Sequence, residues 1–307
     1  MTTDGPLVSV VIVSHDSAAD LDALLPTLDD PRLQVIVVDS ASSDGSAERS
    51  ARPHVTVEAL ADNVGWACGG NLGATRATAP VLAFVNPDAR PTPDQLVALA
   101  SRLDGKTGTV SPRFVDGAGR TAPFYFRFTG PVAGLFCFLQ GGQRIDALLG
   151  HPFIRHREYG SGAQLPRDVD HAGAACLLTR ADTFRTRGRF DDDQFLFFAD
   201  TSFARRVRDS GLRNDVAWDV PVPHSGGASV RRNPVPWIHL HVQRDYLRYV
   251  QRWYGPKVHA LTVAAVMLLT GLLPAALRLL RGRPREACAQ LSYARKICAA
   301  PAPGAPR

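Results

Sequence analysis

The first third of the chain alternates between two kinds of segment: continuous apolar runs, and segments whose apolar residues recur at helical spacing. Continuous β-branched runs cover residues 8–13 and 34–38, residues 81–85 form an apolar run typical of a buried strand, and residues 55–60 form a shorter run. Residues 21–28, 71–78 and 93–103 carry apolar side chains at helical spacing, and Thr92 and Pro93 are typical of a helix start. Strands that alternate with helices in this way predict a mostly parallel sheet with helices on both faces.

The pattern changes in the second half of the chain. From residue 111 to 165 the periodicity fades into a stretch rich in glycine, arginine and aromatic residues, which we interpret as a long, partly mobile connection near a substrate. Residues 169–179 and 215–222 are predicted strands, residues 200–210 are a predicted helix, and the chain from Pro236 onward is helical and basic. The short Ala/Pro tail after Cys298 is expected to be disordered.

One segment near the C-terminus, residues 260–277, is apolar and uncharged. Its length is the lower limit for a membrane span, although Gly271 and Pro274 interrupt it. Four arginines between residues 278 and 285 follow directly, as in a helix that lies on an anionic membrane surface. A buried helical hairpin explains the same pattern, so the sequence leaves all three arrangements open.

Composition narrows the choice of function. The chain has 307 residues, of which 45% are hydrophobic and 21% charged, as in an ordinary globular enzyme. The net charge of +6 favours anionic partners: a nucleotide diphosphate, nucleic acid or a membrane surface. The five cysteines are odd in number and contain no C-x-x-C pair, which argues against a disulfide framework and a zinc site. The first residues lack the basic region of a signal peptide, so we expect a cytoplasmic protein.

Polar side chains follow the predicted strands, at the sheet edge where parallel-sheet proteins bind ligands. These residues are Ser14, His15, Asp39, Asn63, Asn86 and Asp88. Asp39 is placed to accept hydrogen bonds from a nucleobase or a ribose, although it also suits a helix cap together with Ser42, Ser43 and Asp44. Asp88 follows a proline and suits a hard cation that bridges two phosphates, although Asn-Pro-Asp also makes a good turn.

A glycine-rich segment precedes the predicted helix that begins at Asn71. Its glycines do not form G-x-G-x-x-G after the first strand, which weakens a dinucleotide-binding interpretation. Instead, Gly65 and Asn71 would let the backbone approach a ribose or a diphosphate.

These motifs together resemble a known family. The series comprises Val8–Val13, Val37–Ser46, Asp62–Ala67, Asn86–Asp88, Ala172–Arg180, Gly188–Asp191, Phe195–Asp200, Arg206, Gly211 and His224–Ser229. In this order the motifs are similar to family 2 glycosyltransferases with the GT-A fold, and most similar to the bacterial rhamnosyltransferase-like branch. The resemblance covers residues 7–231 and implies an α/β GT-A (Rossmann-like) fold, a mostly parallel sheet flanked by helices, with a helical C-terminal extension.

The resemblance also implies a division of the chain. Residues 1–110 would form the nucleotide-sugar-binding half, residues 111–165 a connection on the side of the sugar acceptor, and residues 166–231 the catalytic half. Residues 232–307 would be the C-terminal extension.

The resemblance assigns roles to single residues. Asp200 would be the general base that deprotonates the sugar acceptor. Asp88 and His224 would hold a divalent metal, Mn²⁺ or Mg²⁺, at the donor diphosphate. The donor nucleotide would contact Ser14, His15, Asp39, Asn63, Gly65 and Asn71. Taken alone, Asp200 is also explained as an acid at a helix start, and His224 as an ordinary loop histidine.

Two departures from the family pattern stand out. Ala199, Thr201 and Ser202 surround Asp200 where the family usually has Glu-Asp-x-Asp, so a glutamate and a second aspartate are missing. Asn86 replaces the first acid of the metal motif, as is common in the rhamnosyltransferase-like branch. Residues 191–193 are nearby acids that would partly compensate, or form a solvated turn.

From the resemblance we expect an inverting transfer of a sugar, L-rhamnose from dTDP-rhamnose, to a hydroxyl of a glycan, glycolipid or small molecule in cell-envelope or natural-product biosynthesis. The arginine- and aromatic-rich residues 120–157 and the apolar C-terminal segment would suit a polyprenyl-linked acceptor and peripheral contact with the inner face of the plasma membrane. Alternatives are a UDP- or GDP-sugar donor and a non-catalytic sugar-nucleotide-binding relative. A nucleic-acid partner is disfavoured, because the acids cluster at the strand ends where a phosphate backbone would dock.

Overall fold

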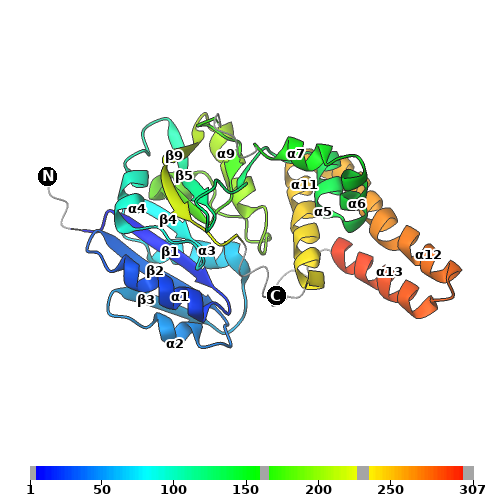
Figure 1. Ribbon diagram of the computed structural model, residues 1–307, viewed down its shortest axis with the longest axis horizontal. Helices are drawn as coiled ribbons and strands as arrows, with labels where there is room; N and C mark the ends of the chain where they lie inside the picture. The colour runs from blue at the N-terminus through cyan, green and yellow to red at the C-terminus, as the bar shows by residue number, and fades with distance from the viewer. Residues whose placement is uncertain (1–4, 160–165, 227–234, 300–307) are drawn as a thin grey trace.

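The computed structural model describes residues 5–159, 166–226 and 235–299. It consists of a sheet domain and a helical lobe beside it (Figure 1). The last residues of the expected His224–Ser229 motif lie outside the described residues, as does the expected tail from residue 300 onward.

A seven-stranded sheet forms the centre of the sheet domain, with the order β3-β2-β1-β4-β8-β5-β9. The strands are β1 (Val8–Ser14), β2 (Leu33–Ser40), β3 (Val55–Leu60), β4 (Val81–Val85), β5 (Thr107–Val115), β8 (Cys176–Arg180) and β9 (Arg213–Pro223). Only β8 runs against its neighbours β4 and β5 in this sheet. The prediction of a mostly parallel sheet is confirmed.

Helices cover both faces of the sheet (Figure 1). Successive side chains of β1 point to opposite faces, and apolar side chains on both faces need a covering layer. Val8, Val10 and Ile12 pack toward α1 (Ala18–Leu24), the short helix η1 (Leu25–Leu28) and α4 (Pro93–Ala100). Val11 packs on the other face, with α3 (Gly65–Arg76), α8 (Ala181–Thr186) and α9 (Ala199–Asp209). The short helix α2 (Ser46–Ser50) lies beside α1. Thr92 caps α4 through a capping box, which confirms the predicted helix start.

The glycine-rich segment is helix and not a turn. We expected the helix to begin at Asn71, but α3 begins at Gly65. A Cβ atom on Gly73 would lie 2.4 Å from Val11 Cγ1, and one on Gly69 would lie 2.8 Å from Val13 Cγ1. These two glycines therefore let α3 pack directly on β1.

The middle segment is not the irregular connection that the fading periodicity indicated. It contains β6 (Tyr125–Phe126), α5 (Pro131–Phe138), α6 (Gln140–Leu148) and α7 (Pro152–Arg157). The helical pattern is obscured because α5 is apolar on several sides: it packs between α11 and the neighbouring short helices. The predicted strand 169–179 is likewise two strands, because β7 (His171–Ala172) leaves the main sheet to pair with β6 before β8 begins.

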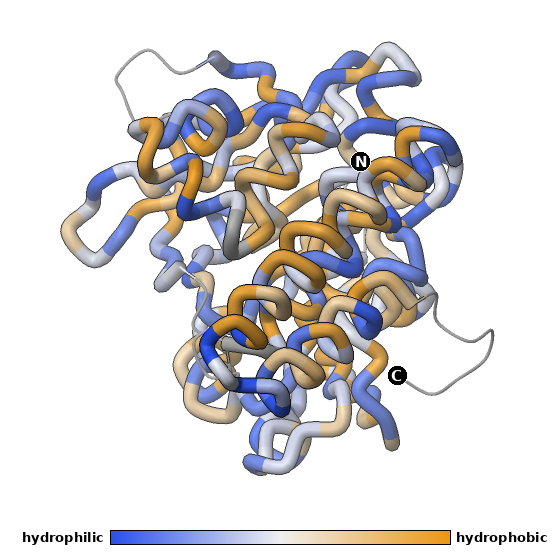
Figure 2. The backbone as a smooth tube through the Cα atoms, turned by 90° about the vertical axis from the view of Figure 1, so that its right-hand side faces the viewer, coloured by the Kyte–Doolittle hydropathy of each residue, from blue (hydrophilic) through white to orange (hydrophobic). Residues whose placement is uncertain are grey.

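The helical lobe joins these middle helices to the C-terminal ones. It comprises α11 (Val235–Val266), the π-helix η2 (Met267–Leu272), α12 (Leu273–Leu280) and α13 (Pro284–Cys298), and α11 kinks at Gly255. Figure 2 faces this lobe and shows hydrophobic residues along its helices. Among the described residues, one helical stretch, Trp237–Leu280, is long and apolar enough to cross a membrane by length and composition.

The apolar segment 260–277 combines features of two of the three expected arrangements. Its small residues face inward: a Cβ atom on Gly271 of η2 would lie 2.9 Å from Ala294 Cβ of α13, and α12 also packs on α13, so the segment forms a hairpin with α13. Its leucines, however, face solvent. Those exposed on η2 and α12 are Leu268, Leu272, Leu273, Leu277, Leu279 and Leu280.

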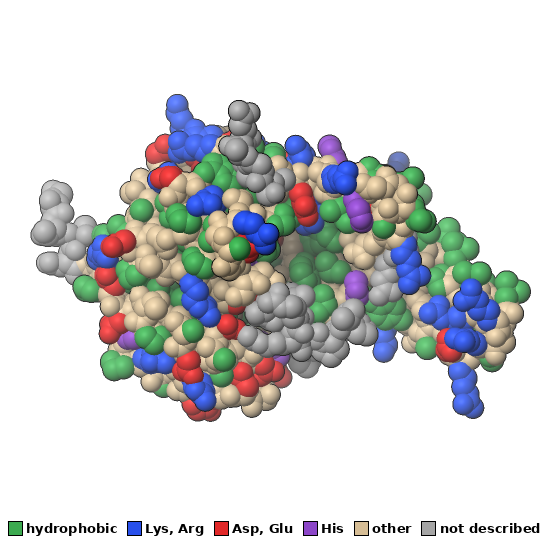
Figure 3. Space-filling view, in the orientation of Figure 1, with side chains coloured by type: hydrophobic (Ala, Val, Ile, Leu, Met, Phe, Trp, Pro, Cys, Tyr) green, Lys and Arg blue, Asp and Glu red, His purple; other side chains and the backbone are tan. Residues whose placement is uncertain are grey.

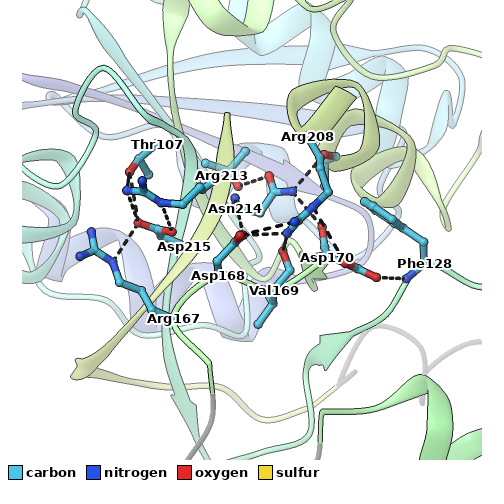
Figure 4. A network of polar contacts seen from close by, with 12 residues as sticks. Thr107, Phe128, Arg167, Asp168, Val169, Asp170, Arg208, Arg213, Asn214 and Asp215 are labelled. Atoms are coloured by element: carbon cyan, nitrogen blue, oxygen red, sulfur yellow. Dashed lines mark hydrogen bonds and ion pairs between the residues drawn. The ribbon is translucent and has the colours of Figure 1, made fainter. Parts of the chain in front are cut away.

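A polar network fixes residues 166–172 against the end of the sheet (Figure 4). Arg167 donates to Asp215 of β9 at 2.9 Å, and Arg208 of α9 donates to Asp168 at 2.7 Å. The Asp170 carboxylate accepts the Phe128 amide at 2.8 Å. The network thereby ties β9 and α9 to the segment that leads into β7.

Candidate active site

A cavity of about 300 Å³ opens between the sheet domain and the helical lobe. Figure 3 shows the hollow between these two parts, with hydrophobic side chains on its floor. The lining polar and charged residues are Asn86, Arg157, His171, Asp200, Thr201 and His224. Three of these, Asn86, Asp200 and His224, were singled out from the sequence.

Asp200 lies in the first turn of α9 and lines the cavity. Its Oδ2 accepts a hydrogen bond from the Ala174 amide at 3.2 Å, and its Oδ1 accepts one from the Thr201 amide at 2.7 Å. Phe198, the residue before α9, has a φ of +67° and lines the same cavity. Asp200 can therefore accept hydrogen bonds at the start of α9 and also face a substrate in the cavity as a base.

Asp88 and His224 are brought together, although they are far apart in the sequence. His224 Nε2 lies 3.3 Å from Asp88 Oδ1, and both side chains are buried. Neither ring nitrogen of His224 forms a hydrogen bond within the described part of the chain. A buried histidine nitrogen beside a carboxylate fits a divalent metal, which often takes few protein ligands and completes its shell with substrate phosphates. The described residues contain no cluster of three or more His, Cys, Asp or Glu side chains that could hold a metal.

Asp39 lies buried at the carboxyl end of β2. Its Oδ1 accepts hydrogen bonds from Ser14 Oγ at 2.8 Å and Ser42 Oγ at 2.6 Å, and its Oδ2 accepts the Ser42 amide at 3.0 Å. It therefore fixes the turn after β2 through Ser42. The expected helix cap is not observed, because Gly45 is the N-cap residue of α2 and no side chain caps that helix. Contact with a nucleobase stays a prediction for Asp39 and Ser14, because a carboxylate has room for further donors.

His15, Asn63 and Gly65 lie near the same strand ends. His15 Nδ1 lies 2.8 Å from the Ser40 carbonyl oxygen, and Asn63 Oδ1 accepts from Ser40 Oγ at 3.1 Å and from the Gly65 amide at 3.0 Å. Gly65 has a φ of +80°, and a Cβ atom there would lie 2.3 Å from the Phe195 carbonyl oxygen. Only glycine fits where α3 begins against the loop that precedes α9.

Asn71 is occupied by a neighbouring loop. Its Nδ2 donates to the Phe190 carbonyl at 2.9 Å and to Asp192 at 2.6 Å, and its Oδ1 accepts the Phe190 amide at 3.1 Å. Asn71 thus fixes the loop before α9, and its expected contact with the donor stays a prediction. Asp191 in this loop pairs with Arg206 at 3.0 Å and with Arg252 at 3.2 Å.

The two departures beside Asp200 have a structural explanation. Ala199 and Ser202 are buried. Ser202 Oγ accepts a hydrogen bond from Trp253 Nε1 of α11 at 3.1 Å. A carboxylate at position 202 would be buried against the helical lobe, so serine suits the packing of α11 on α9.

The sequence analysis missed His171, which lines the cavity from β7. Its Nε2 lies 3.4 Å from Thr201 Oγ1, and its ring stacks parallel to that of Phe128. Burial lowers the pKa of His171 to about 4, so the ring is neutral at pH 7. A histidine beside Asp170, directly before the apolar residues 172–178, was the available signal.

Asp245 of α11 was also missed. Its fully buried carboxylate accepts the amides of Phe195 at 3.1 Å, Leu196 at 2.9 Å and Phe197 at 3.0 Å, and pairs with Arg248 at 3.0 Å. It therefore holds the loop that leads into Asp200. No local sequence pattern connects residues so far apart.

Known proteins resemble this chain in sequence and in fold. Residues 9–149 match the model of glycosyl transferase family 2. N-acetylglucosaminyl-diphospho-decaprenol L-rhamnosyltransferase from Mycobacterium tuberculosis is 22% identical, over 80% of this chain and 85% of that protein.

Solved structures share the fold. A mannosyltransferase from Pyrobaculum calidifontis, in complex with GDP-Man and Mn²⁺, matches with a TM-score of 0.52 and 18% identity, over 95% of this chain and 86% of the other. Glucosyl-3-phosphoglycerate synthase from M. tuberculosis, with Mn²⁺, UDP and its product, matches with a TM-score of 0.51 and 14% identity, over 82% and 81%. The sheet order, the flanking helices and these similarities confirm the expected GT-A fold. Residues 9–149 therefore form a glycosyl transferase family 2 domain, and the chain as a whole is a glycosyltransferase similar to a rhamnosyltransferase.

Proposed function

We propose that the enzyme inverts the anomeric carbon as it transfers a sugar from a nucleotide diphosphate to a hydroxyl group. The observation that carries this proposal is that Asp200 and His224, the latter paired with Asp88, open on one cavity. A base and a diphosphate-binding pair on a shared cavity are what a direct displacement needs.

The chemistry follows from these positions. Asp200 takes the proton of the acceptor hydroxyl while its oxygen attacks the anomeric carbon. The bond from that carbon to the diphosphate oxygen breaks on the opposite face, and the electron pair leaves with the nucleotide diphosphate. Asp88 and His224 would hold a divalent metal, which offsets the charge of the departing diphosphate. The turn held by Asp39 would bind the nucleoside.

The proposed donor is dTDP-L-rhamnose and the proposed acceptor is a polyprenyl-diphosphate-linked sugar. Both rest on the name of the M. tuberculosis relative. The solved structures with GDP-Man or UDP keep GDP- and UDP-sugars as the alternative donors.

A nucleotide-release assay tests the proposal. Purified protein is offered a panel of dTDP-, UDP- and GDP-sugars with Mn²⁺, Mg²⁺ or EDTA, with and without acceptor. We expect release with one nucleotide sugar, loss with EDTA or Asp88→Ala, and a fall of about 10²–10⁴-fold in Asp200→Asn. Donor binding without turnover in the wild type would instead support the non-catalytic alternative, which the missing acids at positions 199 and 202 motivate.

The helical lobe is proposed to rest on the cytoplasmic face of an anionic membrane. The exposed leucines of η2 and α12 offer an apolar surface, and the side chains of Arg281, Arg283 and Arg285 beside it are exposed. Apolar side chains beside arginines favour binding to anionic lipid. Flotation with vesicles tests this: we expect binding to anionic vesicles that Leu272→Asp/Leu277→Asp abolishes. Equal flotation of this variant and the wild type would refute it.

A further inference from the structure

The side chain of Arg157 lines the cavity without an acidic partner among the residues that the structure describes. Arg157 ends α7, and its guanidinium carbon lies 4.2 Å from the ring centre of Phe126 and 5.1 Å from that of Phe138. Its Nε is buried without a hydrogen-bond partner, and no described carboxylate lies within ion-pair distance of it. The rings hold the cation at the cavity wall but give the buried Nε donor no hydrogen-bond acceptor.

The other arginines nearby have partners. Arg127 donates to the carbonyl oxygens of His156 and Glu158, Arg205 donates to Tyr249 Oη at 3.1 Å, and Arg206 pairs with Asp191. A guanidinium withdrawn from water without such partners is costly unless a ligand supplies them. Its planar donors match the oxygens of a phosphate in a bidentate arrangement.

The position of Arg157 favours the acceptor over the donor. It reaches the cavity from the helical lobe, beside Phe138 of α5 and across from Val242 of α11, whereas His224 and Asp88 come from the sheet domain. Burial lowers the pKa of Arg157, and the charges of Glu158 and Asp200 oppose this shift. An anion at Arg157 would therefore lie on the side of the proposed base, next to the lobe with the exposed leucines.

We propose that Arg157 binds a phosphate group of the sugar acceptor, and that this residue selects acceptors linked through a diphosphate to a lipid. The inference rests on the proposed function and names its acceptor subsite. Arg155, two residues earlier on α7, is exposed and does not line the cavity, so it provides a matched control.

A binding experiment tests the site without turnover. Farnesyl diphosphate and farnesol are titrated into the full-length protein in detergent with EDTA, and binding is followed by calorimetry. We expect the wild type and Arg155→Gln to prefer the diphosphate, and Arg157→Gln to lose about tenfold to a hundredfold of that preference. Arg157→Lys, which keeps the charge without the fork, should recover part of it. No preference in the wild type, or an unchanged preference in Arg157→Gln, would overturn the proposal.

Transfer kinetics separate this inference from the proposed function. With the donor found in the panel, Arg157→Gln should raise KM for a diphosphate-linked acceptor by about the same factor. It should lower the rate on an alkyl glycoside of the same sugar far less than the rate on the diphosphate-linked acceptor. An equal loss on both acceptors would refute the role in phosphate binding. If the diphosphate preference depends on Arg157 but no donor is turned over, the site stands and the proposed function fails.

Discussion

Asp245→Asn isolates how the helical lobe holds the active-site loop. The carboxylate accepts one loop amide and Arg248 through Oδ1, and two loop amides through Oδ2. Asparagine keeps one acceptor oxygen and turns an NH₂ group toward two of these donors. Because the side chain is fully buried, two unsatisfied donors cost about 2–5 kcal/mol of unfolding free energy.

Chemical denaturation and nucleotide release together check this estimate. We expect Asp245→Asn to lose about 2–5 kcal/mol of unfolding free energy and to lower kcat, because residues 195–197 lead directly into Asp200. Asp209→Asn, at the exposed end of α9, serves as the control and should behave as the wild type. An Asp245→Asn protein that is as stable and as active as this control would refute the reasoning.

Three further predictions concern stability. The unfolded chain protonates His171 near pH 6.5, whereas the folded protein does so only near pH 4. Acidification from pH 6.5 to pH 5 should therefore cost the wild type about 1.5 kcal/mol of unfolding free energy that His171→Gln does not lose. Denaturation at the two pH values measures this, and an equal loss in the wild type and in His171→Gln would contradict it. Gly73→Ala, whose Cβ would lie 2.4 Å from Val11, should destabilise by about 1–3 kcal/mol, whereas Gly105→Ala, with nothing within 4 Å, should not; equal melting temperatures would contradict it. Mn²⁺ with a nucleoside diphosphate should raise the melting temperature of the wild type but not of Asp88→Asn, and an equal rise would count against the proposed metal pair.

The sheet was predictable because several of its strands are apolar runs with local signals at their ends. Val8–Val13 and Val81–Val85 needed no partner to be recognised. The helices that pack on many sides were not: α5 carries apolar residues around most of its circumference, so it lacks a polar face. The start of α3 was misplaced because glycines that normally indicate a turn here serve close packing against β1.

The residues of the candidate site divide in the same way, into those with a local sequence signal and those without one. Asp200 and Asp88 follow or begin recognisable elements, so motif and position identified them together. Asp245 and Arg157 act through contacts between segments that lie far apart in the sequence, and such contacts leave no local pattern. The neutral state of His171 depends on burial, which only the folded chain shows.

The helical lobe is assembled from two separate stretches of chain, residues 131–157 and 235–299. A Cβ atom on Gly134 of α5 would lie 2.1 Å from the ring of Tyr246, whose side chain is fully buried. A truncation before α11 would therefore not yield a minimal catalytic fragment. It would expose α5 and remove the Asp245 anchor of the loop that leads into Asp200, so the sheet domain and the helical lobe are not separable modules in this protein.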